Sequence, residues 1–160
     1  MIAGLVIAIG TSAGGVTLVD DTGAQHALPE AGQPLLVVYE DQDGGKQNKA
    51  MKALIAAYHD PLPNRAKLTV WPIADLSKWN WWPAKGHALA DVKKAAAKDN
   101  TRILIDWTGA CHKAWGLQRG KNSVVLIGAD GKVRYASEGE TTPAQRDALE
   151  AELKALGLSK

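Results

Sequence analysis

The hydrophobic residues of this chain recur with two periods, one typical of strands and one typical of helices. Residues 35–39 are a continuous apolar run, which predicts a strand buried on both faces of a sheet. Further strands are predicted at residues 67–73, 103–105 and 124–127. A helix is predicted over residues 45–58, between the first two of these strands, and Pro61 and Pro63 end it. Its apolar residues at helical spacing are Met51, Leu54, Ile55 and Tyr58. A strand, a helix and a strand in this order predict a βαβ unit with two parallel strands.

Further helices are predicted towards the C-terminus. Residues 87–98 present one apolar face, and residues 111–115 are long enough for a single helical turn. The last helix begins at Pro143, because Thr142 and Gln145 can form a capping box and proline suits the first helical position. A glycine ends this helix.

Two antiparallel hairpins flank these elements. Residues 16–19 and 25–28 read as an N-terminal hairpin, and an Asp-Gly turn joins residues 124–127 to an alternating strand at 132–135. Strands and helices thus alternate along the chain without repeats or low-complexity linkers. The pattern predicts an α/β domain with a mixed central sheet.

The N-terminus admits two interpretations. The apolar run 2–9 is followed by small residues, of which Thr11 and Ala13 resemble a secretory cleavage site. No Lys or Arg precedes this run, which is shorter than usual, so a buried strand or a disordered start is the alternative. The run is too short to span a bilayer as a helix. We therefore divide the chain into a leader-like segment, 1–14, and one domain, 15–160.

Charge and cysteine content exclude two classes of function. The 160 residues carry 19 Lys and Arg against 17 Asp and Glu, for a formal charge of +2. Because the basic residues are scattered, no nucleic-acid surface is predicted. The single cysteine is Cys111. A dithiol redox cycle within one chain needs two thiols, so the chain is not predicted to be a two-cysteine thiol–disulfide oxidoreductase.

The order of these elements resembles the thioredoxin superfamily, particularly its peroxiredoxin-like and TlpA-like branch with an N-terminal hairpin. Residues 114–133 look like the segment Tyr-Gly-Val-x-Gly-x-Pro-Thr of that superfamily, running into a hairpin. Residues 45–49, 114–117 and 124–139 are most similar to the YtfJ-type family of bacterial proteins. The resemblance implies a thioredoxin-like three-layer sandwich and a periplasmic location. That family has no established activity.

The chain departs from redox-active members of the superfamily at two places. The first is the start of the helix after the first buried strand, where a redox enzyme would place Cys-x-x-Cys. The residues there are Asp43, Gly44, Gly45, Lys46 and Gln47. The second is Asn122, which stands where the superfamily has a cis-proline beside its active cysteines. The two losses together predict that the redox site has been given up.

Cys111 is the remaining candidate nucleophile, and His112 follows it. Adjacent side chains usually point apart, and free cysteines are among the most buried residues. We therefore expect Cys111 to be inert. The alternative is a one-cysteine thiol peroxidase or thiol transferase that uses Cys111.

No metal or cofactor is predicted. The four histidines lie on separate predicted elements without ligand spacing. Asp41 and Asp43 precede a Gly-rich turn and could hold a cation, but their spacing does not fit a calcium loop. A solvated loop is the preferred interpretation, and a cation site remains the alternative.

Trp79, Trp81 and Trp82 form the best candidate for a binding surface, because tryptophan is enriched at interaction hot spots. Alternatively, the three indoles fold back and cover the sheet. The sequence as a whole predicts a redox-inactive thioredoxin-like domain. It would serve as a binding or accessory protein of the bacterial cell envelope, periplasmic or secreted, with a cytoplasmic location as the alternative. Its partner, a protein or a small ligand, is not identified.

Overall fold

The computed structural model describes residues 7–160, and most of the apolar run 2–9 lies outside the described residues. The strands within residues 7–160 are β1 (Val16–Asp20), β2 (Gln25–Leu28), β3 (Leu35–Glu40), β4 (Thr69–Asp75), β5 (Leu104–Asp106), β6 (Ser123–Ile127) and β7 (Val133–Glu138). The helices are α1 (Lys49–His59), α2 (Leu62–Arg65), α3 (Ala84–Lys98), α4 (Ala110–Trp115) and α5 (Pro143–Ala155), with short 3₁₀ helices η1 (Gly44–Lys46) and η2 (Ser77–Trp79).

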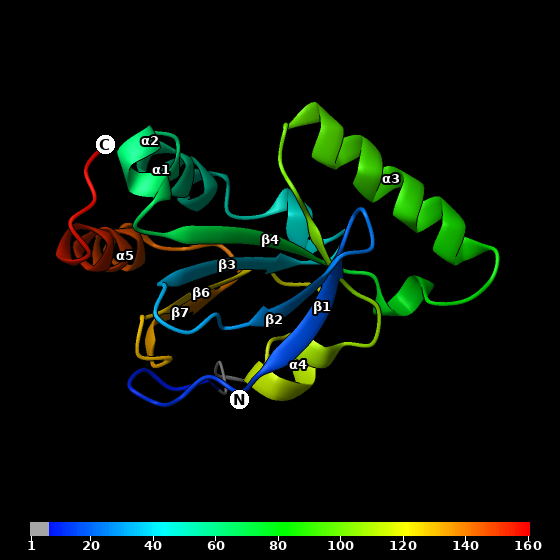
Figure 1. The fold of residues 1–160 in the computed structure, drawn as a ribbon, viewed down its shortest axis with the longest axis horizontal. Coiled ribbons are helices and arrows are strands. Elements are labelled where there is room, and N and C mark those ends of the chain that lie inside the picture. Colours follow the sequence, from blue (N-terminus) through cyan, green and yellow to red (C-terminus); the bar gives the residue numbers. More distant parts are fainter. Residues whose placement is uncertain (1–6) are drawn as a thin grey trace.

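The strands form one mixed sheet in the order β2-β1-β5-β4-β3-β6-β7 (Figure 1). β3, β4 and β5 run parallel to one another. The remaining pairs, β1–β2, β1–β5, β3–β6 and β6–β7, are antiparallel. The predicted βαβ unit, both hairpins and the mixed α/β architecture are therefore confirmed.

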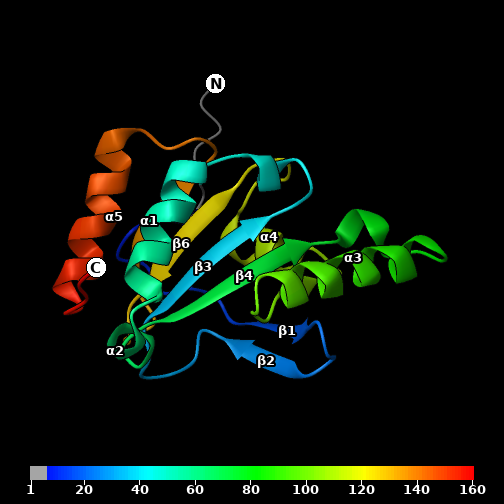
Figure 2. The ribbon, with the colours of Figure 1, turned by 90° about the horizontal axis from the view of Figure 1, so that it is seen from above.

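Helices cover both faces of this sheet. α1 and α5 lie side by side on one face, where Leu36 and Val124 join a cluster with the apolar residues of both helices. α4 lies on the opposite face, where Val37 and Val125 pack in the same cluster as Trp115. Neighbouring residues of β3 and β6 point to opposite faces, and helices cover both faces, so the two strands carry consecutive apolar residues at 35–39 and 124–127. Figure 2 shows the resulting three layers.

α3 stands apart from α1 and α5 in both views (Figures 1 and 2). Of its 15 residues, only Ala84, Val92 and Ala96 are buried. α3 follows η2 and the tryptophan-rich loop, beyond the carboxyl end of β4. None of the helices within residues 7–160 has both the length and the apolar character needed to cross a bilayer.

Two predicted helix starts are wrong, whereas α1 ends at His59, before Pro61 and Pro63, as predicted. α1 begins at Lys49, because Asn48 adopts a left-handed conformation with φ of 63° and separates α1 from η1. Pro63 lies inside the short helix α2, where proline is tolerated because the first helical turn needs no N–H donor there. α3 begins at Ala84, earlier than the predicted residue 87.

The residues just before β1 contact the domain. The N–H of Gly10 donates to the carbonyl oxygen of Val133 over 2.7 Å. The indole N–H of Trp115 donates to the carbonyl oxygen of Gly14, also over 2.7 Å. The division of the chain after residue 14 stays a prediction.

Candidate functional site

At the predicted position of the lost cysteine pair, two backbone segments lie in close contact. Gly44 begins η1 and is buried. A Cβ atom on Gly44 would lie 2.7 Å from the carbonyl carbon and oxygen of Lys121 and 3.0 Å from the nitrogen of Asn122. Packed atoms do not approach so closely, so a side chain at Gly44 requires the Lys121–Asn122 backbone to move. Among the described residues, the atom nearest to a Cβ atom on Gly45 would be Glu40 Oε1, at 3.7 Å.

Asn122 is fully buried just before β6 and is held by three side chains. Its Nδ2 donates to Glu40 Oε2 over 2.7 Å. Its backbone N–H donates to Gln47 Oε1 over 3.2 Å, and its Oδ1 accepts from Asn48 Nδ2 over 2.9 Å. Gln47 and Asn122 thus lie together, whereas Asp43 and Lys46 are exposed. The interpretation of these positions as a former redox site stays a prediction.

Asn48 extends this network to the segment that precedes α5. Its Oδ1 accepts from the hydroxyl of Thr141 over 2.7 Å, and its backbone N–H donates to Glu140 Oε1 over 2.6 Å. Asn48 is 1% exposed. Its left-handed backbone is one that asparagine tolerates better than most residues. The network therefore joins α1, β6 and the chain before α5, and its buried amides are occupied by bonds within the protein.

Cys111 lies in the first turn of α4 and has no exposed surface. Burial raises the pKa of its thiol, and the nearby carboxylates of Asp106 and Asp75 raise it further. A thiol needs access and thiolate character to act as a nucleophile, and Cys111 has neither. Cys111 is thus buried as expected, whereas its inertness stays a prediction.

Asp106, a buried carboxylate that was not predicted as a site residue, holds the start of α4. Its Oδ1 accepts from the N–H of Ala110 over 2.8 Å, and its Oδ2 accepts from the N–H of Cys111 over 2.9 Å. The hydroxyl of Tyr39 donates to the same Oδ2 over 3.1 Å. Burial and the charge of Asp106 raise the pKa of Tyr39, so its hydroxyl stays protonated as a donor. The sequence signal for this helix-capping role was an aspartate between a predicted strand and a predicted helix.

The His112 ring is held by the backbone of the loop that follows α4. Its Nδ1 donates to the carbonyl oxygen of Leu117. Among residues 7–160, no group of three or more His, Cys, Asp or Glu side chains is arranged to hold a metal ion.

The loop after β3 uses Asp41 to bind its own backbone. Asp41 accepts from the N–H of Gly44 over 2.9 Å and from the N–H of Gly120 over 2.8 Å. Burial alone would raise the pKa of Asp41, but these two donors and the charge of Lys78 outweigh burial and lower the pKa. Asp41 thus binds the backbone of its own loop and of Gly120, while Asp43 is exposed. Within residues 7–160, neither aspartate belongs to a group of three or more His, Cys, Asp or Glu side chains that could hold a metal ion.

The three candidate tryptophans are exposed. Trp79 is 40% exposed, Trp81 56% and Trp82 89%, so the alternative that they fold back over the sheet is wrong. The indole N–H of Trp81 donates to the carbonyl oxygen of Lys78 over 3.1 Å, which fixes that ring. Trp79 and Trp81 line a pocket, and Trp82 is not among its lining residues.

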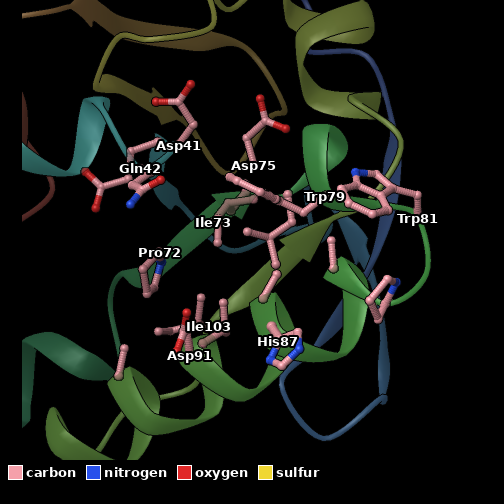
Figure 3. A pocket seen from close by; sticks show the side chains of 18 residues that line it. Asp41, Gln42, Pro72, Ile73, Asp75, Trp79, Trp81, His87, Asp91 and Ile103 are labelled. Carbon is pink, nitrogen blue, oxygen red and sulfur yellow. The ribbon is translucent and has the colours of Figure 1, made fainter.

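This pocket, which we call the α3 pocket, lies between β4 and α3 and has a volume of about 710 Å³ (Figure 3). Pro72 and Ile73 of β4 lie along one side, and Ala88 and Val92 of α3 along the other. The tryptophans carry a signal in the sequence but the pocket does not, because its walls come from separate segments.

Comparison with solved structures shows what the fold resembles. The thioredoxin domain of a thiol-disulfide oxidoreductase from Bacteroides vulgatus is 17% identical, with a TM-score of 0.61, and the match covers 92% of this chain and 99% of that chain. A Chlorobium tepidum protein, described provisionally as a thiol:disulfide interchange protein DsbE, is 19% identical, with a TM-score of 0.66 and 94% and 98% covered. A mutant PrxQ from Xylella fastidiosa is 15% identical, with a TM-score of 0.66 and 96% and 99% covered.

These similarities confirm the thioredoxin-like fold and its likeness to the TlpA-like and peroxiredoxin-like branch. No family model matches the sequence, and no curated protein matches it either. At this level of identity the comparison extends to the fold alone.

Proposed function

We propose that this protein is a redox-inactive thioredoxin-like domain that works by binding. The observation that carries this proposal is the environment of its single thiol, because Cys111 has no exposed surface and a raised pKa. The positions 44–47 contain no thiol, and Gly44 packs against the Lys121 backbone. A thioredoxin-like fold that lacks a nucleophile at its usual site can still bind a partner through its surface. Here that surface carries exposed tryptophans beside a pocket.

The similar structures of known description are thiol oxidoreductases and a PrxQ protein, which favours the alternative that Cys111 is a peroxidase or transferase nucleophile. A peroxide or a disulfide would have to reach a sulfur atom that is enclosed by the core cluster of β3, β5 and α4. The burial of Cys111 is observed in this chain itself, so we give it more weight than a likeness in fold to other proteins.

Two assays with one matched variant test the proposal. The rate of insulin reduction by dithiothreitol is expected to be the same with and without the protein, and hydrogen peroxide is expected to leave the native thiol unmodified. Cys111→Ala serves as the control for thiol chemistry. A reductase or peroxidase rate that requires the protein and disappears in Cys111→Ala would overturn the proposal.

We further infer that the protein belongs with the YtfJ-type family and is exported to the periplasm. The leader-like run 2–9 and the resemblance at residues 114–117 and 124–139 support this inference. Expression of the full chain in a bacterial host is expected to give an N-terminally shortened product in the periplasmic fraction. Full-length protein confined to the cytoplasm would contradict export.

A further inference from the structure

The α3 pocket combines apolar walls with one sign of charge. Within residues 7–160, four carboxylates line it, from Glu40, Asp41, Asp75 and Asp91, whereas no Lys or Arg does. Figure 3 shows Asp41 and Asp75 at one end and Asp91, a residue of α3, at the other, with Ile73 between them. An occupant of this pocket therefore meets apolar atoms along its body and negative charge at both ends.

The carboxylates differ in how far the protein already neutralises them. Glu40 pairs with Lys52 over 2.8 Å, and is therefore largely neutralised. Asp41 and Asp75 are each near one cation, at 3.7 Å from Lys78 and 3.9 Å from Arg119.

Both cations sit on side chains that are about half exposed, 55% for Lys78 and 46% for Arg119, so water screens the two pairs. Asp91 has no ion pair with any residue from 7 to 160, and it is exposed. The pocket thus retains an excess of negative charge.

The tryptophans supply a second attraction for a cation. Trp79 and Trp81 line the pocket next to Asp75, as Figure 3 shows, and the bond to Lys78 holds the Trp81 ring in place. The negative face of an indole attracts ammonium and quaternary ammonium groups. One such contact already exists nearby, since Lys85 Nζ lies 4.8 Å from the centre of the Trp107 ring.

We propose that the α3 pocket binds a small organic cation, an amine or quaternary ammonium carried on an apolar body. The volume of about 710 Å³ falls within the range of small-molecule sites. The charge of the carboxylates selects for a cation, and the apolar walls select for its body. The proposal rests on the proposed function, because it gives the redox-inactive domain its ligand class.

Three probes that share one body and differ in charge test this proposal. They are 2-phenylethylamine, 2-phenylethanol and phenylacetate, each titrated at neutral pH while the indole N–H signals are followed by NMR. The amine is expected to bind at least about tenfold more tightly than the alcohol, and phenylacetate still more weakly, because cation–π and carboxylate attraction act on the amine alone. Equal affinity of amine and alcohol, or no shift with the amine, would overturn the proposal.

Variants locate the site. Trp81→Ala is expected to weaken amine binding about tenfold, and Asp91→Asn is expected to reduce the preference for amine over alcohol. Trp82→Ala is the matched control, because Trp82 is exposed outside the pocket, and it should leave affinity unchanged. An unchanged signal of the buried Trp115 indole shows that each variant is folded. Amine binding that survives Trp81→Ala and Asp91→Asn refutes this pocket as the site, whereas the redox assays test the domain's inactivity independently.

Discussion

Gly44 and Gly45 are neighbours in the sequence, but they differ in what surrounds them. An added Cβ at Gly44 would lie 2.7 Å from the Lys121 backbone, whereas the nearest atom to an added Cβ at Gly45 is a flexible carboxylate at 3.7 Å. Backbone atoms in a packed interior cannot yield as a surface side chain can. The contact between Gly44 and Lys121 therefore fixes how closely the loop after β3 approaches the start of β6.

This difference gives a paired prediction at the residue scale. Gly44→Ala is expected to lower the free energy of unfolding by about 1–3 kcal/mol, the usual cost of forcing extra atoms into a packed site. Gly45→Ala serves as the control and should change stability by less than about 0.5 kcal/mol. Urea unfolding of both variants measures the difference. Equal stabilities would mean that the Lys121–Asn122 backbone moves without cost.

At the scale of elements, α1, α5 and the C-terminus are joined by one carboxylate. Glu150 of α5 accepts from the hydroxyl of Tyr58 over 2.7 Å, and Lys160 Nζ lies 2.8 Å from the same oxygen. The bonds from Lys160 and then Tyr58 lower the pKa of Glu150 to about 2. Burial, followed by Glu150, raises the pKa of Tyr58 to about 12.

The shifted pKa of Glu150 predicts how acid affects the contact between α1 and α5. In the unfolded chain the carboxyl titrates near 4.5, so its stabilising effect is complete above that pH and is lost as the pH falls towards about 2. Glu150→Gln is expected to be less stable than the natural chain at pH 6, and the gap should close towards pH 2. Urea unfolding across this range measures the gap, with Glu152→Gln as a control on the same helix. A gap that is constant with pH would contradict the assigned contact.

Elements with a complete local signal were predicted well. The last helix begins at Pro143 as predicted, and Thr142 and Gln145 form the reciprocal capping box. The start of α1 was misplaced because the left-handed Asn48 is held by Thr141, which is 93 positions away in the sequence. Hydrophobic periodicity carries no information about such a distant partner.

At the scale of the whole molecule, Cys111 belongs to the core cluster that unites β1, β3, β5, β6 and α4. Because it is packed on all sides, the thiol becomes accessible only when much of that cluster opens. The sequence predicted a buried cysteine from residue statistics alone. It did not predict that Tyr39 and Asp106, 67 positions apart, would meet beside it, nor that β4 and α3 would leave a pocket between them.

The single thiol can therefore report on global unfolding. Alkylation of Cys111 by iodoacetamide is expected to be about a thousandfold slower or more in the native protein than in urea-unfolded protein. The rate should rise with urea with the same slope as the equilibrium free energy of unfolding. A fast rate that is independent of urea would indicate a local opening around α4 and would contradict the burial of the thiol.

The contact between Gly44 and Lys121 also has a genetic consequence. Two of the four glycine codons become a cysteine codon by one nucleotide change, so a thiol at position 44 lies one or two nucleotide changes away, depending on the codon. Such a change would place a side chain 2.7 Å from a peptide carbonyl before a partner cysteine existed beside it. The backbone before β6 must therefore shift first, and this order of steps is a barrier to acquiring a dithiol at this position.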